Sequence, residues 1–307
     1  MKHIFILNPA AGKGMAERVV LPKILKAVKE TDVSYEIHRT MNVGDAEHFS
    51  RNRCIAHPEE DLRFYAVGGD GTLNEVVNGI VGFDHAELAF LPAGSGNDFA
   101  RVFANPQYFT DIVRQIKGSA KPIDLLRYNE RYCVNMINIG LDCEVVDEVV
   151  SLKKMTPLSG SMAYLAGIAV VFMGNRGFEL SLTMEDGSTL SDEFTLVAIA
   201  NGAYCGGGFK GATNAVIDDG LLDINIVKKL SRHAFLALLP HYKKGTHLQQ
   251  KIAQKFISYH QCHSISIRPT GIEPIKICVD GEIEFAKEIT VTIVSKAIRF
   301  SVPEGCE

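Results

Sequence analysis

The sequence predicts an α/β protein in two parts, a doubly wound parallel sheet followed by a mostly antiparallel β domain. Two observations lead to this prediction. Over about the first 120 residues, short apolar runs alternate with stretches in which apolar residues recur at helical spacing, as in successive βαβ units. After residue 122 the apolar runs follow one another across short polar turns, as in hairpins.

The first part contains four predicted strands, at residues 3–7, 35–40, 64–67 and 88–92. Helices are predicted at 15–29 with Pro22 near a bend, at 44–57, from Thr72 onward, at 97–103 and at 108–118, where Gly118 is the expected C-cap. Ligands of such sheets bind beyond the carboxyl ends of the strands. The turns that follow the strands are therefore where a site is expected.

The second part contains strand-like runs joined by short turns. Residues 123–139 predict a hairpin that turns at Asn129–Glu130, and residues 178–201 predict another that turns near Asp186–Gly187. Further strand-like runs cover 221–227, 264–269, 274–282 and 289–294, and one long helical stretch covers 232–257. This succession of strand-like runs and short turns predicts a mostly antiparallel β domain.

Composition limits the possible functions. The chain has 307 residues, 46% hydrophobic and 22% charged, with a formal net charge of −4, so a broad nucleic-acid-binding surface is not expected. Its seven cysteines form no CxxC pair, which suggests neither a zinc site nor a disulfide framework and favours a reducing cytosol. The start "MKHIFILNP" predicts a strand and not a signal peptide. Residues 162–173 are too short to span a bilayer and predict a core helix.

Two turns of the first part share one pattern, a buried strand, a glycine turn and an early aspartate. "FYAVGGDGTLNEV" places Asp70 among glycines, and "LPAGSGNDFARVF" places Asp98 in the same position after the next strand. A glycine turn that leads into a helix N-terminus suits a phosphate. A carboxylate beside a phosphate requires a divalent cation between them. Each turn alone could also be structural, with the aspartate as a local cap, but two at one sheet edge favour a phosphate and metal site.

Two other glycine-rich segments carry weaker signals. "NPAAGKG" (8–14) follows the first strand and lacks the full Walker A pattern, so it could hold phosphate or be a plain turn. "GGGFKG" (206–211) matches GxGxxG literally, but no helix follows it. A flexible loop is the better interpretation there.

Taken in order, "NPAAGKG", "GGDGTLNEV", "GSGNDFAR", "DDGLLD" and "DGE" resemble the diacylglycerol kinase catalytic-domain family, and most of all its soluble bacterial lipid kinases. The resemblance covers nearly the whole chain. GGDG also occurs in NAD kinases and some phosphofructokinases, whereas "NDFAR" with "NPxxG" points to the lipid branch. Many members have Thr where this chain has Ser95.

The resemblance implies an ATP-binding α/β domain at residues 1–122, to which a segment of about 290–307 returns. It also implies a β-sandwich at 123–289 that receives a lipid acceptor, with the active site in the cleft between the two. The residues implied to contact the nucleotide are Asn8, Gly12, Lys13, Gly14, Thr40, Gly68, Gly69, Asp70, Gly71, Thr72, Leu73, Asn74 and Ser95.

The resemblance further implies catalytic and metal roles. Asp70 and Asp98 would order the catalytic Mg²⁺ and water, and Glu282 of "VDGE" would be the general base that takes the proton of the lipid hydroxyl. A structural Mg²⁺ would be held by Asp219 and by the carbonyl groups of Val216 and Leu221. The "DDG" segment would equally suit a simple hairpin turn.

The leading functional hypothesis is therefore a Mg-ATP-dependent kinase that converts diacylglycerol to phosphatidic acid. A sphingoid base, ceramide or phosphatidylglycerol are alternative acceptors, and an NAD-kinase-like enzyme or an ATP-holding regulator are alternative functions. We expect a cytoplasmic protein that associates reversibly with membranes, with Arg101, Lys153 and Lys154 as candidate membrane-facing cations. No nucleic acid partner is expected, and a homodimer is compatible with the resemblance.

Overall fold

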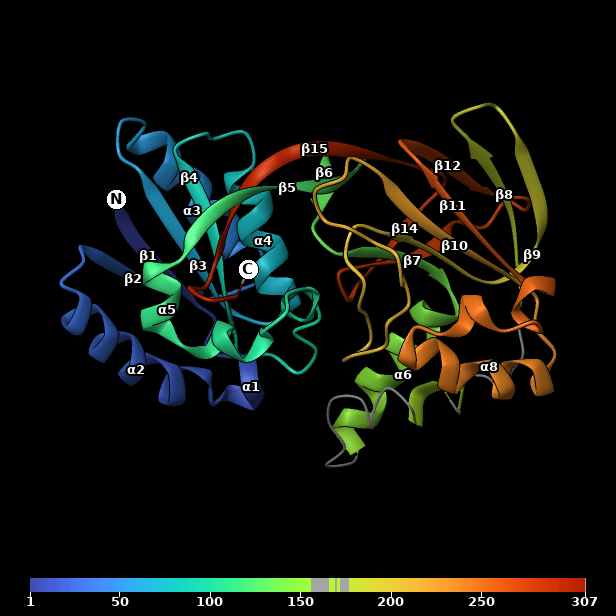
Figure 1. The fold of residues 1–307 in the computed structure, drawn as a ribbon, viewed down its shortest axis with the longest axis horizontal. Coiled ribbons are helices and arrows are strands. Elements are labelled where there is room, and N and C mark those ends of the chain that lie inside the picture. Colours follow the sequence, from blue (N-terminus) through green and yellow to red (C-terminus); the bar gives the residue numbers. More distant parts are fainter. Residues whose placement is uncertain (156–165, 169, 172–176, 307) are drawn as a thin grey trace. The chain divides into compact units, whose positions relative to one another are not determined.

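The computed structural model describes residues 1–155, 166–168, 170–171 and 177–306, with the backbone alone for 150–155. The chain forms two compact units (Figure 1). Unit 1 comprises Met1–Asp124 and Ser295–Glu307, and unit 2 comprises Leu125–Val294. Unit 1 is thus discontinuous in sequence, because the chain returns to it after completing unit 2.

Unit 1 is built on a parallel sheet. Its strand order is β2 (Tyr35–Arg39), β1 (Lys2–Leu7), β3 (Leu62–Gly68) and β4 (Ala86–Pro92), all parallel. The end of β15 (Ile289–Val302) adds a further parallel strand beside β4. Strands β1, β3 and β4 are buried along almost their whole length, which is why they appear in the sequence as continuous apolar runs.

Helices cover both faces of this sheet. Side chains such as Phe5, Tyr65 and Leu91 pack against α2 (Ala16–Thr31) and α5 (Ile112–Lys117). Alternate strand residues point to the opposite face, where α3 (Asp45–Ala56) and α4 (Asp70–Ile80) lie against each other. The doubly wound parallel sheet predicted from the sequence is confirmed.

An ion-pair network, buried at Arg63 and Glu87, holds the returning strand β15 through the half-exposed Arg299. The Arg63 guanidinium lies 2.8 Å from the Glu87 carboxylate, and both side chains are almost fully buried. Arg299 of β15 lies 2.6 Å from the other oxygen of Glu87. Arg63 also donates to the carbonyl groups that end α5, those of Gln115, Ile116 and Gly118. The network therefore joins β3, β4, β15 and α5.

Two predicted helices of unit 1 are corrected by the structure. Residues 97–103 form only one 3-10 turn, η1 (Phe99–Val102). Residues 108–118 are divided into η2 (Pro106–Thr110) and α5 by Asp111, whose carboxylate accepts the N–H of Arg114 and caps α5. Gly118 does end α5, but with an extended backbone instead of the left-handed one that a glycine cap usually has.

In unit 2 every described strand pairing is antiparallel. One path runs β14 (Glu282–Ala286), β13 (Ile275–Val279), β7 (Met136–Gly140), β9 (Thr189–Ala200), β8 (Phe178–Met184) and β12 (Ser264–Pro269), followed by the start of β15. β10 (Leu222–Lys228) pairs with β9 and β11 (Ile257–Cys262). β5 (Ser119–Tyr128) enters the unit and turns at Asn129 into β6 (Arg131–Cys133). The predicted hairpins and the antiparallel class are confirmed.

The described residues of unit 2 form two apolar cores. One is enclosed by inward-facing side chains of nearly all its strands, among them Ile137, Leu182, Ile224 and Ile277. The other lies between the opposite face of β7, β9 and β10 and the helices α6 (Leu141–Met155) and α8 (Arg232–Lys244). The helices thus cover a second surface of the same strands.

The helical stretch predicted at 232–257 is shorter in the structure. α8 ends at Lys244, because Gly245 adopts the left-handed backbone of a C-cap. The short turns η3 (His247–Gln249) and η4 (Ala253–Lys255) and then β11 follow. Of the core helix predicted at 162–173, residues 166–168 and 170–171 are helical and the rest lie outside the described residues. Within the described part of the chain, no helix has both the length and the apolar composition needed to cross a membrane.

Candidate nucleotide and metal sites

Three glycine-containing loops of unit 1 meet at the carboxyl edge of its sheet. A Cβ atom on Gly94, after β4, would lie only 2.5 Å from the Cα atom of Gly69, after β3. A Cβ atom on Gly12, after β1, would lie 3.0 Å from the carbonyl oxygen of Ala93. Side chains would push these backbones apart, so the sequence uses glycine where the loops touch.

Asn8 and Thr72 join the first loop to the start of α4. The Asn8 amide donates to the Thr72 hydroxyl at 3.0 Å, and its oxygen accepts the N–H of Ala10. A Cβ atom on Gly68 would collide with the same Thr72 side chain. Two of the predicted nucleotide-contacting residues, from segments about sixty positions apart, are thereby held together.

Asp70 connects the two aspartate turns. Its carboxylate accepts the backbone N–H groups of Asn97 at 2.8 Å and of Asp98 at 2.9 Å. A Cβ atom on Gly96 would lie 2.7 Å from one Asp70 oxygen and 3.4 Å from one Asp98 oxygen, so both carboxylates border one point. Asp98 is almost fully buried and pairs with Arg101 at 3.4 Å. Asp70 therefore tethers the second loop and also lies beside a second carboxylate. A structural role and a role in a phosphate and metal site are compatible with this arrangement.

The first loop has an unusual backbone. Gly12, Lys13 and Gly14, within α1 (Ala11–Gly14), have φ values of 59°, 60° and 77°. Lys13 therefore adopts a conformation that costs a non-glycine residue roughly 1–2 kcal/mol. Backbone strain of this kind is often found at ligand-binding loops.

The other predicted nucleotide residues of unit 1 occupy varied positions. Thr40 follows β2, where its N–H bonds to the Leu7 carbonyl, and Ser95 lies in the loop that Asp70 tethers. Gly71 and Asn74 belong to the first turns of α4. Leu73 is fully buried in the core, so only its backbone can face a ligand.

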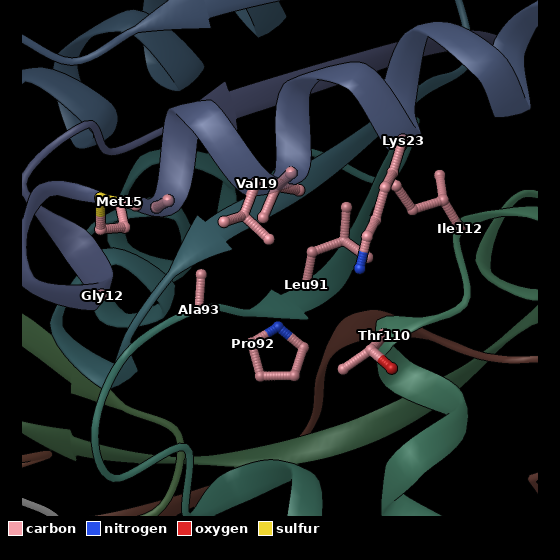
Figure 2. A pocket seen from close by; sticks show the side chains of 11 residues that line it. Gly12, Met15, Val19, Lys23, Leu91, Pro92, Ala93, Thr110 and Ile112 are labelled. Carbon is pink, nitrogen blue, oxygen red and sulfur yellow. The ribbon is translucent and has the colours of Figure 1, made fainter.

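A cavity that the sequence did not predict adjoins these loops (Figure 2). Its volume is about 280 Å³, and it lies between α2 and the end of β4. Gly12 and Ala93 form one end of it, and Lys23 extends from α2 with its amino group toward Leu91. The remaining lining is mostly apolar: Met15, Ala16, Val19, Val20, Pro92, Thr110 and Ile112. These residues come from three separate segments with no shared motif, so the cavity could not be predicted from the sequence.

In unit 2, the predicted structural metal site lies on the turn before β10. The Asp219 carboxylate accepts the N–H of Leu221 at 3.0 Å, and Val216 is half exposed. Two residues into β10, Asp223 is fully buried and accepts hydrogen bonds from Tyr259 and Gln261 on one oxygen. Burial, and to a smaller extent the nearby Asp219 carboxylate, raises the pKa of Asp223.

The residues around this turn fit a hard cation. Among the described residues, no hydrogen-bond donor reaches the second Asp223 oxygen or the side-chain oxygen of Asn225, although both are buried. An orphaned buried oxygen near a second carboxylate suits Mg²⁺, which prefers oxygen ligands. No group of three or more His, Cys, Asp or Glu side chains in the described part of the chain is arranged to hold a metal, so backbone carbonyls would have to complete the set. The sequence did not identify Asp223.

Glu282 also belongs to unit 2. It is the exposed first residue of β14, and not the end of the preceding strand as the sequence suggested. The turn before it is held by Asp280, a buried residue whose carboxylate accepts the backbone N–H groups of Val134, Asn135 and Met136 at 3.0–3.1 Å. The Cys133 thiol donates to it as well. Asp280 lies in the turn and not on the strand of Glu282, and it fixes the turn from which Glu282 projects.

A small cavity of about 50 Å³ lies beneath α8 in unit 2. Its walls are mostly apolar, with Leu196, Val227 and Phe235 among them. His247 lines it, and burial lowers its pKa to about 4. The imidazole is therefore neutral near pH 7. This apolar cavity was not predicted from the sequence either.

Comparisons with known proteins agree with this architecture. The model of the diacylglycerol kinase catalytic domain matches residues 2–128, and that of the YegS C-terminal NAD kinase beta sandwich-like domain matches residues 135–302. The chain is 33% identical over 248 residues to the "Probable lipid kinase YegS-like" of Shewanella frigidimarina, covering 78% of this chain and 76% of that protein. It is 29% identical over 282 residues to the diacylglycerol kinase of Bacillus subtilis, covering 90% and 88%.

A solved structure supports the same conclusion. A candidate diacylglycerol kinase from Bacillus anthracis superposes on the whole of this chain and on 98% of its own length, with a TM-score of 0.75 and 26% sequence identity. The predicted resemblance is thus confirmed across both units, including the β-sandwich class of unit 2. The chain belongs to the diacylglycerol kinase catalytic-domain family, among the lipid kinases in which a YegS-type β-sandwich follows that domain.

Proposed function

We propose that this protein transfers the γ-phosphate of ATP to the hydroxyl group of a lipid, with diacylglycerol as the first acceptor to test. The observation that carries the proposal is the meeting of three glycine loops in unit 1, with Asp70 and Asp98 bordering one point between them. Backbone N–H groups at such loops suit phosphate oxygens. Two adjacent carboxylates suit a phosphate only when a divalent cation is bound with it.

Within this proposal the residues of unit 1 bind and orient the donor. Asn8, Gly12 to Gly14, Gly68 to Asn74 and Ser95 surround the phosphates, with Leu73 contributing its backbone, and Thr40 lies along the rest of the nucleotide. Mg²⁺ bound near Asp70 and Asp98 would offset the charge of the phosphates. Glu282 of unit 2 accepts the proton of the attacking hydroxyl, since a carboxylate in hydrogen-bond reach can act as a general base.

The choice of a lipid acceptor rests on the family. The relatives in both comparisons carry lipid kinase or diacylglycerol kinase names.

An acceptor screen tests the reaction. Purified protein, Mg²⁺ and γ-labelled ATP are offered diacylglycerol, a sphingoid base, ceramide, phosphatidylglycerol and NAD, and the products are separated by thin-layer chromatography. Label in phosphatidic acid supports the proposal. Label in another lipid changes only the acceptor, whereas label in NADP or in no product rejects a lipid kinase.

We also propose that Mg²⁺ stabilises unit 2 through Asp219, Asp223 and the carbonyl groups of Val216 and Leu221. An ion that binds only the folded state raises its stability by mass action. The wild type should melt at a higher temperature when Mg²⁺ is added, and Asp219→Ala should lose most of that increment. Glu185→Ala, in an exposed pair with His263, is the matched control and should keep it. Equal increments in wild type and Asp219→Ala would reject the metal site.

A further inference from the structure

Residues 224–272 form a long segment without acidic residues. The whole chain has 36 Asp and Glu residues and a net charge of −4, yet these 49 positions contain none, while they include eight Lys and Arg residues. The segment covers most of β10, α8, the turns η3 and η4, β11 and β12. Unit 2 therefore contains a stretch of sequence whose positive charge is not offset by acidic residues within that stretch.

Part of this charge is neutralised locally and part is not. Lys228 and Lys229 pair with Asp192 and Glu193 at 2.7 Å. Lys244, Lys251 and Lys255 are exposed, and none of them forms an ion pair with the residues that the structure describes. These three ammonium groups lie on α8 and the turns that follow it.

The exposed face of α8 is apolar as well as cationic. Its inner side buries Ala234, Phe235 and Leu238. Leu236, Ala237 and Pro240 share the outer face at helical spacing, and the side chain of Leu236 is 63% exposed. Ile252, just before η4, is 41% exposed. The outer face of a helix in water normally carries charged residues instead. Figure 1 shows α8 at the periphery of unit 2.

We propose that the outer face of α8, with Leu236, Lys244, Lys251, Ile252 and Lys255, is the surface through which this protein lies on an anionic lipid bilayer. Exposed apolar residues with flanking cations are typical of helices that lie in a membrane interface. Nucleic acid would also attract the cations but would gain nothing from Leu236 and Ile252. The proposal rests on the proposed function only in that a lipid acceptor brings the protein to a membrane.

The other cations that the sequence suggested as membrane-facing are less well supported. Arg101 is already engaged, with Asp98 at 3.4 Å and with the Gly96 carbonyl group. The side chains of Lys153 and Lys154 lie outside the described residues. The acid-free segment is therefore the better-supported surface.

Sedimentation with vesicles tests the surface apart from catalysis. The full chain is mixed, without ATP or acceptor, with vesicles of equal parts phosphatidylglycerol and phosphatidylcholine, and with pure phosphatidylcholine vesicles. The wild type should bind the anionic vesicles and release at high salt, because screening shortens the reach of charge to about 3 Å at 1 M. Lys244→Gln with Lys251→Gln and Lys255→Gln should weaken binding about a hundredfold, at about 1 kcal/mol for each cation.

A second variant and a control separate the two contributions. Leu236→Gln with Ile252→Gln should weaken binding at high and low salt alike, because the apolar contact is not screened. Leu25→Gln with Lys26→Gln and Lys29→Gln on α2, where Leu25 is 44% exposed, is the control and should bind as the wild type does. Melting temperatures confirm that each variant is folded.

Three results would overturn the proposal. The first is unchanged vesicle binding by the triple lysine variant. The second is an equal loss in the α2 control. The third is tighter binding of the wild type to single-stranded RNA than to anionic vesicles at the same salt. Because no substrate is present, a failed acceptor screen leaves this test unaffected.

Discussion

Each unit uses an aspartate that precedes a glycine to hold a neighbouring segment of backbone, but in different surroundings. Asp70 of unit 1 receives two backbone N–H groups from the loop after β4, next to another carboxylate. Asp280 of unit 2 receives three N–H groups and a thiol from residues 133–136, in a buried position. Asp70 also lies beside the Asp98 carboxylate, and this difference is the reason for proposing a chemical role for Asp70 and a structural role for Asp280.

The largest effect on stability is expected from Asp280→Ala. Three buried N–H groups would lose their acceptor, and each costs about 1–3 kcal/mol when left unsatisfied, so the free energy of unfolding should fall by about 3 kcal/mol or more. Urea denaturation measures this. Asp70→Ala removes two less deeply buried bonds and should cost less. If Asp70→Ala were the more destabilising, the contrast between the two turns would be wrong.

The next effect concerns the residue that Asp280 helps to position. Glu282→Gln keeps the size of the side chain and removes the proton acceptor, so kcat should fall at least about a hundredfold, with ATP binding and melting temperature unchanged. Glu284→Gln lies two residues further on the same face of β14, where Glu284 accepts a bond from Tyr128. This control should keep kcat near the wild-type value. Nearly normal turnover by Glu282→Gln would assign the proton to another group.

A smaller effect tests the glycine loops of unit 1. In Gly69→Val the branched side chain would press on Gly94, because even a Cβ atom would lie 3.4 Å from its Cα. Affinity for ATP should fall more than tenfold, which is about 1.4 kcal/mol. Gly271→Val in unit 2 is the control, since its Cβ would meet no atom within 4 Å. Unchanged ATP binding of a folded Gly69→Val variant in titration calorimetry would reject the phosphate-loop assignment.

The smallest effect compares one buried histidine in each unit. Burial lowers the pKa of His3 in unit 1 and of His247 in unit 2 to about 4. An unfolded histidine has a pKa near 6.5, so below that pH the unfolded chain binds more protons and stability falls toward pH 4. His3→Gln and His247→Gln should each reduce the loss between pH 7 and pH 5.5 by about 1 kcal/mol. Denaturation at both pH values measures it, and an unchanged slope in both variants would show that other groups govern the acid loss.

The sequence predicted most strands well, because their periodicity and turn residues agree. Asn129, for example, has the positive φ that a tight hairpin turn requires, and the strands pair as expected around it. Boundaries that depend on caps were less accurate. The expected helix at 97–103 became a 3-10 turn where Asp70 holds the first N–H groups, and the stretch at 232–257 ended at Gly245.

The candidate site residues also divide into those that a linear sequence pattern predicts and those that only the fold reveals. The glycine loops follow a linear pattern, so Asn8, Gly12, Gly69 and Asp70 could be named before their contacts were known. Asp223 could not, because the reason for proposing it is an oxygen that no donor among the described residues reaches. The cavity beside α2 is also a property of three packed segments and not of any one of them.

The return of β15 to unit 1 has a consequence for the order in which the chain can fold during synthesis. The ribosome makes all of Leu125–Val294 before it makes Arg299, the partner of Glu87, and Phe300, the neighbour of Leu88 in the sheet. Until then the nascent unit 1 has an unpaired edge at β4, and Glu87 lacks one of its two arginine partners, while the β-sandwich emerges and can fold first. Domains otherwise tend to fold from the N-terminus onward. In this protein the three glycine loops are synthesised early, but the sheet that supports them is completed last.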